Sequence, residues 1–497
     1  MRTLLFALCL LLSGQAPAID KAAVARLIEG DNDEKIEAIG ALVAEGDPEA
    51  AALLAKFAEG EVVVGGKSVE VVVNNRVRGA VTSALAALNL LSPEPAARLA
   101  AARALAGGAG AAMLPLVRKA LDKEADPDIR PLLELVASSM EMNSGDRETR
   151  LAAIRRLGES NSPNSRTLLA AAATDADEDI RIAAQKGLRD VQGRLAWGER
   201  AGLLFAGVSL GSILLLAALG LAITYGLMGV INMAHGELIM IGAYTTYMAQ
   251  NFFKVNFPKA FDWYLVAAIP ASFVAAALVG MFLERAVIRW LYGRPLETLL
   301  ATWGISLMLI QSVRSLFGAA NVQVENPAFM SGGIQAFAGV VLPWSRIYIV
   351  AFAALVLFLI YFLLTKTRLG LFVRGVTQNR EMASCVGVHT GRVDMWAFGL
   401  GSGIAGLAGC ALSQIGNVGP DLGQGYIVDS FMVVVFGGVG QLAGTVYAAL
   451  TLGFANKFLE SVSGAVIAKI VVLVFIIFFI QRRPQGLFAV KGRAVEG

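Results

Sequence analysis

Cysteine, histidine and charged residues are all scarce in this chain of 497 residues. Its three cysteines, Cys9, Cys385 and Cys410, offer no disulfide framework and no metal-ligand spacing. With only two histidines, we predict neither a metal site nor a cofactor. Charged residues make up 16% of the chain and hydrophobic residues 56%, whereas globular proteins average about 25% charged residues. This balance indicates a membrane protein, and the net charge of +3 gives no reason to expect nucleic acid as a partner.

The first 18 residues have the pattern of a secretory signal peptide. M-R-T-L-L-F-A-L-C-L-L-L-S-G-Q-A-P-A contains one Arg, then an apolar run, then small residues at Ala16 and Ala18. We expect cleavage after Ala18, and a short uncleaved anchor is the alternative. Both readings predict that residues 19–200 are exported to the periplasm.

Residues 19–200 have a helical, Ala-rich pattern with an internal duplication. R-L-A-A-A-R-A-L at 98–105 recurs as R-L-A-A-I-R-R-L at 150–157, and A-D-P-D-I-R at 125–130 recurs as A-D-E-D-I-R at 176–181. The two offsets, 52 and 51 residues, agree. Helical pairs with Asp-rich turns resemble HEAT-like repeats, which stack to bury a shared core.

A β-hairpin is predicted at residues 61–73, turning at Gly65 and Gly66. Its G-G-K-S string is similar to part of a phosphate-binding loop. However, Glu61 stands where the first glycine of that loop should be, and both flanks are strand-like. The string is therefore interpreted as a turn.

Residues 201–497 contain apolar runs of membrane-spanning length. The runs lie at 203–225, 228–250, 264–284, 297–317, 346–365, 393–415, 428–442, 444–460 and 465–481. We therefore predict an all-α fold, in which an exported helical-repeat domain with a small hairpin precedes a polytopic helical bundle of about 8–10 spans.

Basic residues give the expected orientation of this bundle. They cluster at 285–294, 366–392 and 482–493, and the positive-inside rule places such stretches in the cytoplasm. Nine crossings after an exported domain satisfy all three placements. The C-terminus is then cytoplasmic.

Polar residues interrupt the second apolar run. Asn232, His235 and Glu237 lie in G-V-I-N-M-A-H-G-E-L, and a carboxylate at bilayer depth costs roughly 2.5–3.5 kcal/mol. Asn232 and His235 can share one helix face, whereas Glu237 points elsewhere unless the helix breaks at Gly236. We predict that Asn232, His235, Gly236 and Glu237 line a solute pathway. The alternative is that these groups cap or tie a kinked helix.

The basic loop 366–392 contains a second candidate site. E-M-A-S-C-V-G at 381–387 matches the E-A-A-x-x-x-G pattern of ABC-importer permeases, with Met382 in place of the first Ala. Such a short helix can insert into a cleft on a partner, with flanking arginines to orient it and a glycine to end it. The candidate coupling residues are Arg374, Arg380, Glu381, Ala383 and Gly387. The alternative is an ordinary basic cytoplasmic loop.

Further motifs extend the resemblance across residues 201–497. They are R-P-L-E-T-L-L-A-T-W-G-I-S-L at 294–307, T-R-L-G-x-x-x-R-G-V at 367–376, the glycine stripe at 399–409, F-G-G-V-G-Q-L-A-G-T at 436–445 and R-R-P-Q-G-L-F at 482–488. Together with the polar stretch, they resemble the branched-chain amino acid type of ABC importer permease. A signal peptide and an appended exported domain are similar to the permease of urea (Urt-type) ABC importers.

The resemblance implies a permease subunit of the bacterial inner membrane that works by alternating access and is not itself an enzyme. Its implied partners are ATP-binding subunits, a second homologous permease, a periplasmic solute-binding protein and membrane lipid. Urea is the implied solute, and branched-chain amino acids or short-chain amides are the alternatives. A membrane-anchored sensor or scaffold is a different possibility. An intramembrane hydrolase is another, in which Ser402 would be the nucleophile and His235 the base.

Overall fold

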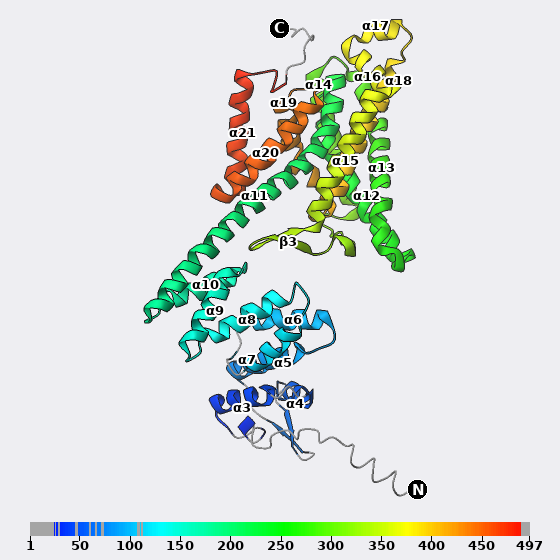
Figure 1. The fold of residues 1–497 in the computed structure, drawn as a ribbon. Coiled ribbons are helices and arrows are strands. Elements are labelled where there is room, and N and C mark those ends of the chain that lie inside the picture. The colour runs from blue at the N-terminus through cyan, green and yellow to red at the C-terminus, as the bar shows by residue number, and fades with distance from the viewer. Residues whose placement is uncertain are drawn as a thin grey trace, which may run out of the picture. The chain divides into compact units, whose positions relative to one another are not determined.

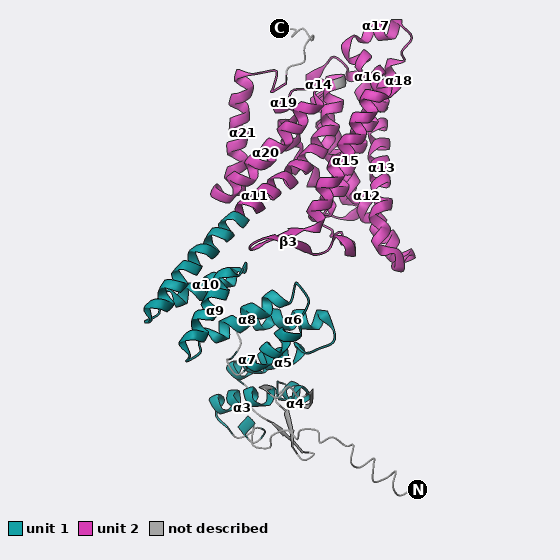
Figure 2. Cartoon of the chain, in the orientation of Figure 1, with its two compact units in different colours: residues 1–198 teal, residues 199–497 magenta. Residues whose placement is uncertain are grey.

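A computed structural model describes residues 24, 26–27, 30–44, 48–58, 61–64, 67–70, 74–106, 110 and 113–488. The predicted signal peptide, residues 1–18, and the turn at Gly65 and Gly66 lie outside the described residues. Contacts divide the chain into two compact units, residues 1–198 and 199–497 (Figure 2). This division falls close to residue 201, where the sequence becomes more apolar.

The described residues of unit 1, which spans residues 1–198, are helical apart from one hairpin (Figure 1). Its elements are α3 (Asn32–Ala44), α4 (Pro48–Ala58), β1 (Glu61–Val64), β2 (Lys67–Glu70), α5 (Asn75–Asn89), α6 (Pro95–Ala106), α7 (Leu114–Lys123), α8 (Arg130–Glu141), α9 (Arg147–Glu159), α10 (Pro163–Ala172) and the first part of α11 (Glu178–Met228). β1 pairs antiparallel with β2, which confirms the predicted hairpin. Local sequence starts the helices: Asp146 accepts a hydrogen bond from the Thr149 amide at 3.0 Å and caps α9.

The duplicated sequences occupy equivalent positions in unit 1. The first copy lies in α6 and the second in α9. Arg98 Nε donates to Glu124 Oε2 at 2.8 Å, and the equivalent Arg150 pairs with Asp175. The two A-D-x-D-I-R copies end in Arg130 and Arg181. Arg130 donates to the backbone carbonyl oxygen of Glu124 at 3.1 Å, and Arg181 donates to that of Asp175 at 3.5 Å. The hydrogen bond from Arg98 also lowers the pKa of Glu124, so this pair is ionised at neutral pH. These matching contacts support the internal duplication.

Unit 2, residues 199–497, is a bundle of helices (Figures 1 and 2). After α11 come α12 (His235–Asn256), η2 (Pro258–Trp263), α13 (Tyr264–Ala286), η3 (Ile288–Leu291), α14 (Pro295–Phe317), η4 (Ala328–Met330), β3 (Gly333–Phe337), β4 (Val340–Pro343), α15 (Trp344–Lys366), α16 (Arg368–Gln378), α17 (Arg380–Cys385), α18 (Thr390–Ser413), α19 (Leu422–Gly437), α20 (Leu442–Ser463) and α21 (Ala465–Arg482). Each of the nine apolar runs predicted from the sequence overlaps one of these helices, although the run 228–250 begins before α12 and the run 428–442 extends past the end of α19. The hairpin of β3 and β4 was not predicted.

Six helices among the described residues are long and apolar enough to cross a membrane, which is fewer than the 8–10 spans expected. They are α11, α13 together with η2, α14, α15, α18 and α21. Of the remaining predicted spans, α19 has only 16 residues. Polar residues lower the hydropathy of the other two, α12 and α20. In α12 these residues contact protein, because α13, α14, α18 and α19 pack around this helix, and a helix that faces protein needs less apolar surface.

Helix α18 forms the centre of unit 2, because the glycine stripe at 399–409 lets neighbouring helices pack closely against it. A Cβ added at Gly401 would overlap the backbone of Gly220 in α11, and one at Gly406 would overlap the backbone of Ser272 in α13. Conversely, a Cβ at Gly242 in α12 would overlap Gly406. Small residues let membrane helices approach to backbone contact. The stripe therefore holds three helices against α18.

One buried carboxylate gives a stability prediction for unit 1. Glu141, in α8, has a side chain only 2% exposed, and it pairs with Arg118 of α7 at 2.6 Å and with Arg156 of α9. Replacing Glu141 by Ala removes hydrogen bonds to two charged groups, so we expect unit 1 to lose about 2 kcal/mol of stability. Hydrogen exchange of the α8 amides in the full chain should accelerate about 30-fold.

The matched control is Glu134→Ala in the same helix. Glu134 pairs with Arg130 one turn away, and both side chains are half exposed. Exposed pairs of this kind contribute about 0.3–0.5 kcal/mol, so exchange should change little. Equal effects of the two variants would contradict the role assigned to Glu141.

Candidate functional site

The polar stretch of the second apolar run forms a break between two helices. α11 ends at Met228, Gly229 has a positive φ of 64°, and α12 begins at His235. Only glycine adopts such a φ without strain. Asn232 stabilises the turn, because its Oδ1 accepts a hydrogen bond from the Ala234 amide at 3.0 Å. The helix therefore does not break at Gly236: the break lies at residues 229–234, before α12 begins.

Gly236 has a packing role instead. It lies in the first turn of α12, where a Cβ would overlap the carbonyl group of Gly423 in α19. A Cβ at Gly423 would in turn overlap the backbone of Gly236. The two helices thus meet backbone to backbone beside the break. In sequence, a packing glycine and a helix-breaking glycine look the same.

The three polar side chains at the break contact different neighbours. His235 is fully buried and its Nε2 lies 2.9 Å from the carbonyl oxygen of Ala217 in α11. Because a carbonyl only accepts, Nε2 is the donor. Glu237, 2% exposed, accepts a hydrogen bond from Ser306 Oγ of α14 at 2.7 Å. The expectation that Asn232 and His235 share a helix face is wrong, since Asn232 precedes the helix.

Each of these side chains keeps one buried polar atom without a hydrogen-bond partner among the described residues. The atoms are Asn232 Nδ2, His235 Nδ1 and Glu237 Oε2. A buried polar atom left unpaired costs about 1–3 kcal/mol. The observed hydrogen bonds tie the segment to α11 and α14, as the structural alternative expects. The unpaired atoms leave it able to bond a polar solute as well.

The second candidate site is built around Arg380 at the start of α17. Arg380 pairs with Asp394, which is buried in the first turns of α18. Its guanidinium also lies over the ring of Tyr292, 4.8 Å from the ring centroid. The Tyr292 hydroxyl donates to Glu284 Oε1 of α13 at 3.0 Å. Arg380 therefore anchors the short helix α17 to α18 and, through Tyr292, to α13.

The other predicted coupling residues divide into anchored and exposed groups. Arg374 donates to the carbonyl oxygen of Leu364 at 2.7 Å, and Ala383 is buried. Gly387, with φ of 88°, allows the chain to turn after α17. Glu381 is exposed, as is the apolar side chain of Met382. The sequence analysis missed Asp394, although an acidic residue within an apolar run was a usable signal.

Ser402 and His235 do not form a hydrolase pair. Ser402 packs against Gly280 of α13, whereas His235 bonds to α11. Neither Ser402 Oγ nor His235 Nδ1 has a hydrogen-bond partner in the part of the chain that is described, so they do not bond each other. Within the same residues, no group of three or more His, Cys, Asp or Glu side chains could hold a metal ion.

Gly236 provides a test of the packing at the break. Gly236→Ala forces α12 away from Gly423, and overpacking of this kind costs about 1–3 kcal/mol. The melting temperature of the purified protein in detergent should fall. The control is Gly304→Ala in α14, where a Cβ meets nothing within 4 Å. A variant at Gly236 as stable as the control would show that the close contact does not exist.

Comparison with known proteins identifies the membrane unit. Residues 203–480 match the family model described as "Branched-chain amino acid transport system / permease component". The chain is 28% identical over 290 residues to the high-affinity branched-chain amino acid transport system permease protein BraD of Pseudomonas aeruginosa. It is 30% identical over 293 residues to the corresponding permease protein LivH of Escherichia coli K12. Each alignment covers 57% of this chain and 94% of the relative.

A more distant similarity links the chain to the ribose import permease protein RbsC of Escherichia coli, with 29% identity over 107 residues, 20% of this chain and 33% of the relative. No solved structure matches the chain. The family match covers more than half of the 497 residues and includes the break, the coupling segment and the glycine stripe. The chain therefore belongs to the family of permease components of branched-chain amino acid type transport systems.

Proposed function

We propose that this chain is the membrane-spanning permease subunit of an ATP-driven importer that moves a small solute into the cytoplasm by alternating access. The observation that carries the proposal is the family match over residues 203–480. The break at 229–234 supports a solute path beside it, because broken helices with freed polar groups flank solute sites in transporters. Asn232, His235, Gly236 and Glu237 are the proposed pathway residues.

The proposed orientation puts α16, α17 and the C-terminus in the cytoplasm and unit 1 in the periplasm of a bacterial inner membrane. Basic residues at 285–294, 366–392 and 482–493 support it. In this arrangement residues 1–18 are a signal peptide and residues 19–200 an exported HEAT-like repeat domain. The matching contacts of the two repeat copies support the repeat assignment.

The importer needs partners, since the permease supplies the path and other subunits bind ATP. We propose that Arg374, Arg380, Glu381, Ala383 and Gly387 form the segment that contacts an ATP-binding subunit. A second homologous permease and membrane lipid cover the apolar outer faces of α15 and α21, where large side chains are exposed, among them Phe358, Phe362, Val474 and Phe478. A periplasmic solute-binding protein delivers the solute.

Urea is the solute that we propose. The relatives match 94% of their own length but only 57% of this chain, and the family match covers residues 203–480, so unit 1 lies outside the family match. An exported unit before the permease is similar to the urea type of importer. Branched-chain amino acids are the second candidate, and the names of the relatives favour them.

Arg380 allows the coupling segment to be tested. Arg380→Ala removes the ion pair with Asp394 and the contact with Tyr292, so α17 loses its anchor to α18. Losing hydrogen bonds between charged groups costs about 1.5–3 kcal/mol. We therefore expect solute-stimulated ATP hydrolysis by the assembled importer to fall at least tenfold.

The control for Arg380 is Lys366→Ala, which also removes one positive charge from the stretch 366–392 but at an exposed position. It should leave ATP hydrolysis within twofold of the original protein. If both variants behave alike, α17 is not the coupling helix.

The choice of solute can be tested by reconstituting the complete importer in proteoliposomes. We expect the urea-loaded binding protein to stimulate ATP hydrolysis severalfold and the leucine-loaded protein to have no effect. Stimulation by leucine alone would establish the amino acid alternative, and stimulation by a short amide alone the amide alternative. If no ATP-binding subunit assembles with the chain, a membrane-anchored sensor or scaffold becomes the better explanation.

A further inference from the structure

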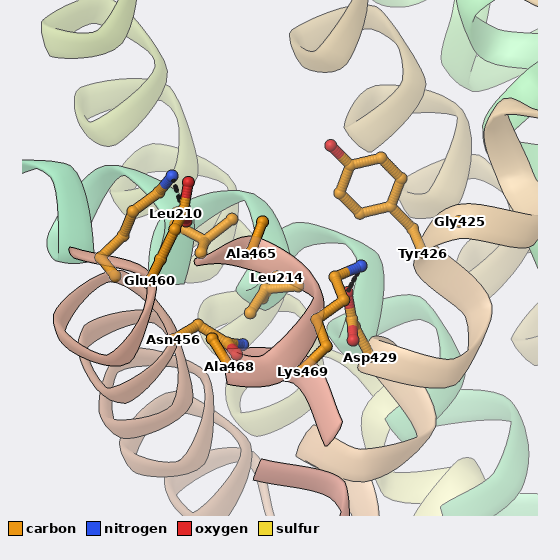
Figure 3. A pocket seen from close by; sticks show the side chains of 11 residues that line it. Leu210, Leu214, Gly425, Tyr426, Asp429, Asn456, Glu460, Ala465, Ala468 and Lys469 are labelled. Atoms are coloured by element: carbon orange, nitrogen blue, oxygen red, sulfur yellow. Dashed lines mark hydrogen bonds and ion pairs between the residues drawn. The ribbon is translucent and has the colours of Figure 1, made fainter. Parts of the chain in front are cut away.

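A cavity lined by both charged and apolar side chains lies in unit 2, among residues that neither site described above includes. It has a volume of about 270 Å³ and is lined by residues of α11, α19, α20 and α21 (Figure 3). The junction of α20 with α21 lies at the end of the bundle opposite α17 (Figure 1). In the proposed orientation this end faces the periplasm, where a solute arrives.

Two ion pairs line the cavity. Lys469 Nζ donates to Asp429 Oδ2 at 3.1 Å, and Lys457 Nζ donates to Glu460 Oε2 at 2.7 Å. The Asp429 side chain is only 10% exposed, although it lies in an apolar helix. Two acids and two bases cancel in formal charge. The cavity therefore favours a neutral or zwitterionic molecule over an ion.

Asn456 provides an independent observation that points to a ligand. This residue of α20 lines the cavity and is only 7% exposed, and its Oδ1 has no hydrogen-bond partner among the described residues. A buried amide oxygen without a donor costs about 1–3 kcal/mol. A ligand N–H group at this position would remove the cost.

We propose that this cavity is a binding site for the transported solute at the outer end of the permease, and that it takes a small molecule with N–H donors beside a carbonyl or carboxylate oxygen. The inference rests on the proposed importer function. The Asn456 amide oxygen and the carboxylates of Asp429 and Glu460 accept from the N–H groups, and the two lysines donate to the oxygen. Leu210 and Leu214 form an apolar wall.

Urea and an α-amino acid share this donor and acceptor chemistry. Urea has four N–H donors around one carbonyl oxygen. An amino acid has an ammonium beside a carboxylate, and its side chain would contact the apolar wall. The experiment therefore includes both molecules as probes.

Equilibrium binding of radiolabelled urea and radiolabelled leucine to the purified permease complex without its solute-binding protein tests the site. Asn456→Leu removes the acceptor with little change in volume. Ala465→Trp adds a bulky side chain at the exposed rim, where it disturbs no buried packing. The control is Ser461→Ala, an exposed residue of α20 that does not line the cavity.

We expect the complex to bind one of the two probes. Asn456→Leu should raise its Kd about three- to tenfold, the effect of one lost hydrogen bond, and Ala465→Trp should raise it at least as much because its side chain obstructs the cavity rim. Ser461→Ala should bind like the original protein. If Asn456→Leu fails to fold, Ala465→Trp decides the question alone.

The proposal is overturned if the original complex binds neither probe, or if the cavity variants bind as tightly as the control. Failure of the importer function is a separate result, in which the loaded solute-binding protein does not stimulate ATP hydrolysis by the original complex. Binding of leucine alone supports the cavity as the solute site and identifies an amino acid as its ligand.

Discussion

Backbone contact between helices at glycine is the constraint on which the membrane unit depends. α18 contacts α11 at Gly401 and α13 at Gly406, and Gly242 brings α12 against the same helix. A single methyl group at any of these positions would overlap a neighbouring backbone. Because lipid tails are as apolar as leucine, close packing of this kind replaces the hydrophobic effect as the force that joins the helices.

This tight centre explains where polar groups occur. α12 is enclosed by protein, so it can carry His235 and Glu237, which would be costly against lipid. The break before α12 leaves buried polar atoms unpaired beside the close contact of Gly236 with Gly423. At the end of the bundle near α17, Arg380 links a short helix to the central helix through Asp394. Arg380 is thus a direct contact between α17 and the helix that holds the bundle together.

Much of this architecture could be predicted from the sequence, because hydropathy and charge act locally. Each of the nine apolar runs overlaps a helix, and the repeated A-D-x-D-I-R motif marked matching positions in unit 1. The sequence could not show whether the helix breaks at Gly229 or at Gly236, because a glycine needed for its positive φ and a glycine needed for close packing are the same residue type. The β3–β4 hairpin was missed because its strands are only five and four residues long. Pairs such as Arg380 with Asp394 depend on the tertiary fold.

Orientation in the membrane is the central claim, because the solute path, the coupling helix and the outer cavity all depend on which end faces the periplasm. Cys385 in α17 is exposed, whereas Cys410 is buried. Ser461, near the junction of α20 with α21, is exposed at the opposite end of the bundle. A membrane-impermeant thiol reagent should label a Ser461→Cys variant in cells with a permeable outer membrane. Cys385 should react only after the inner membrane is opened. Labelling of Cys385 in intact inner membranes, with Ser461→Cys protected, would contradict the proposed function and the outer cavity together.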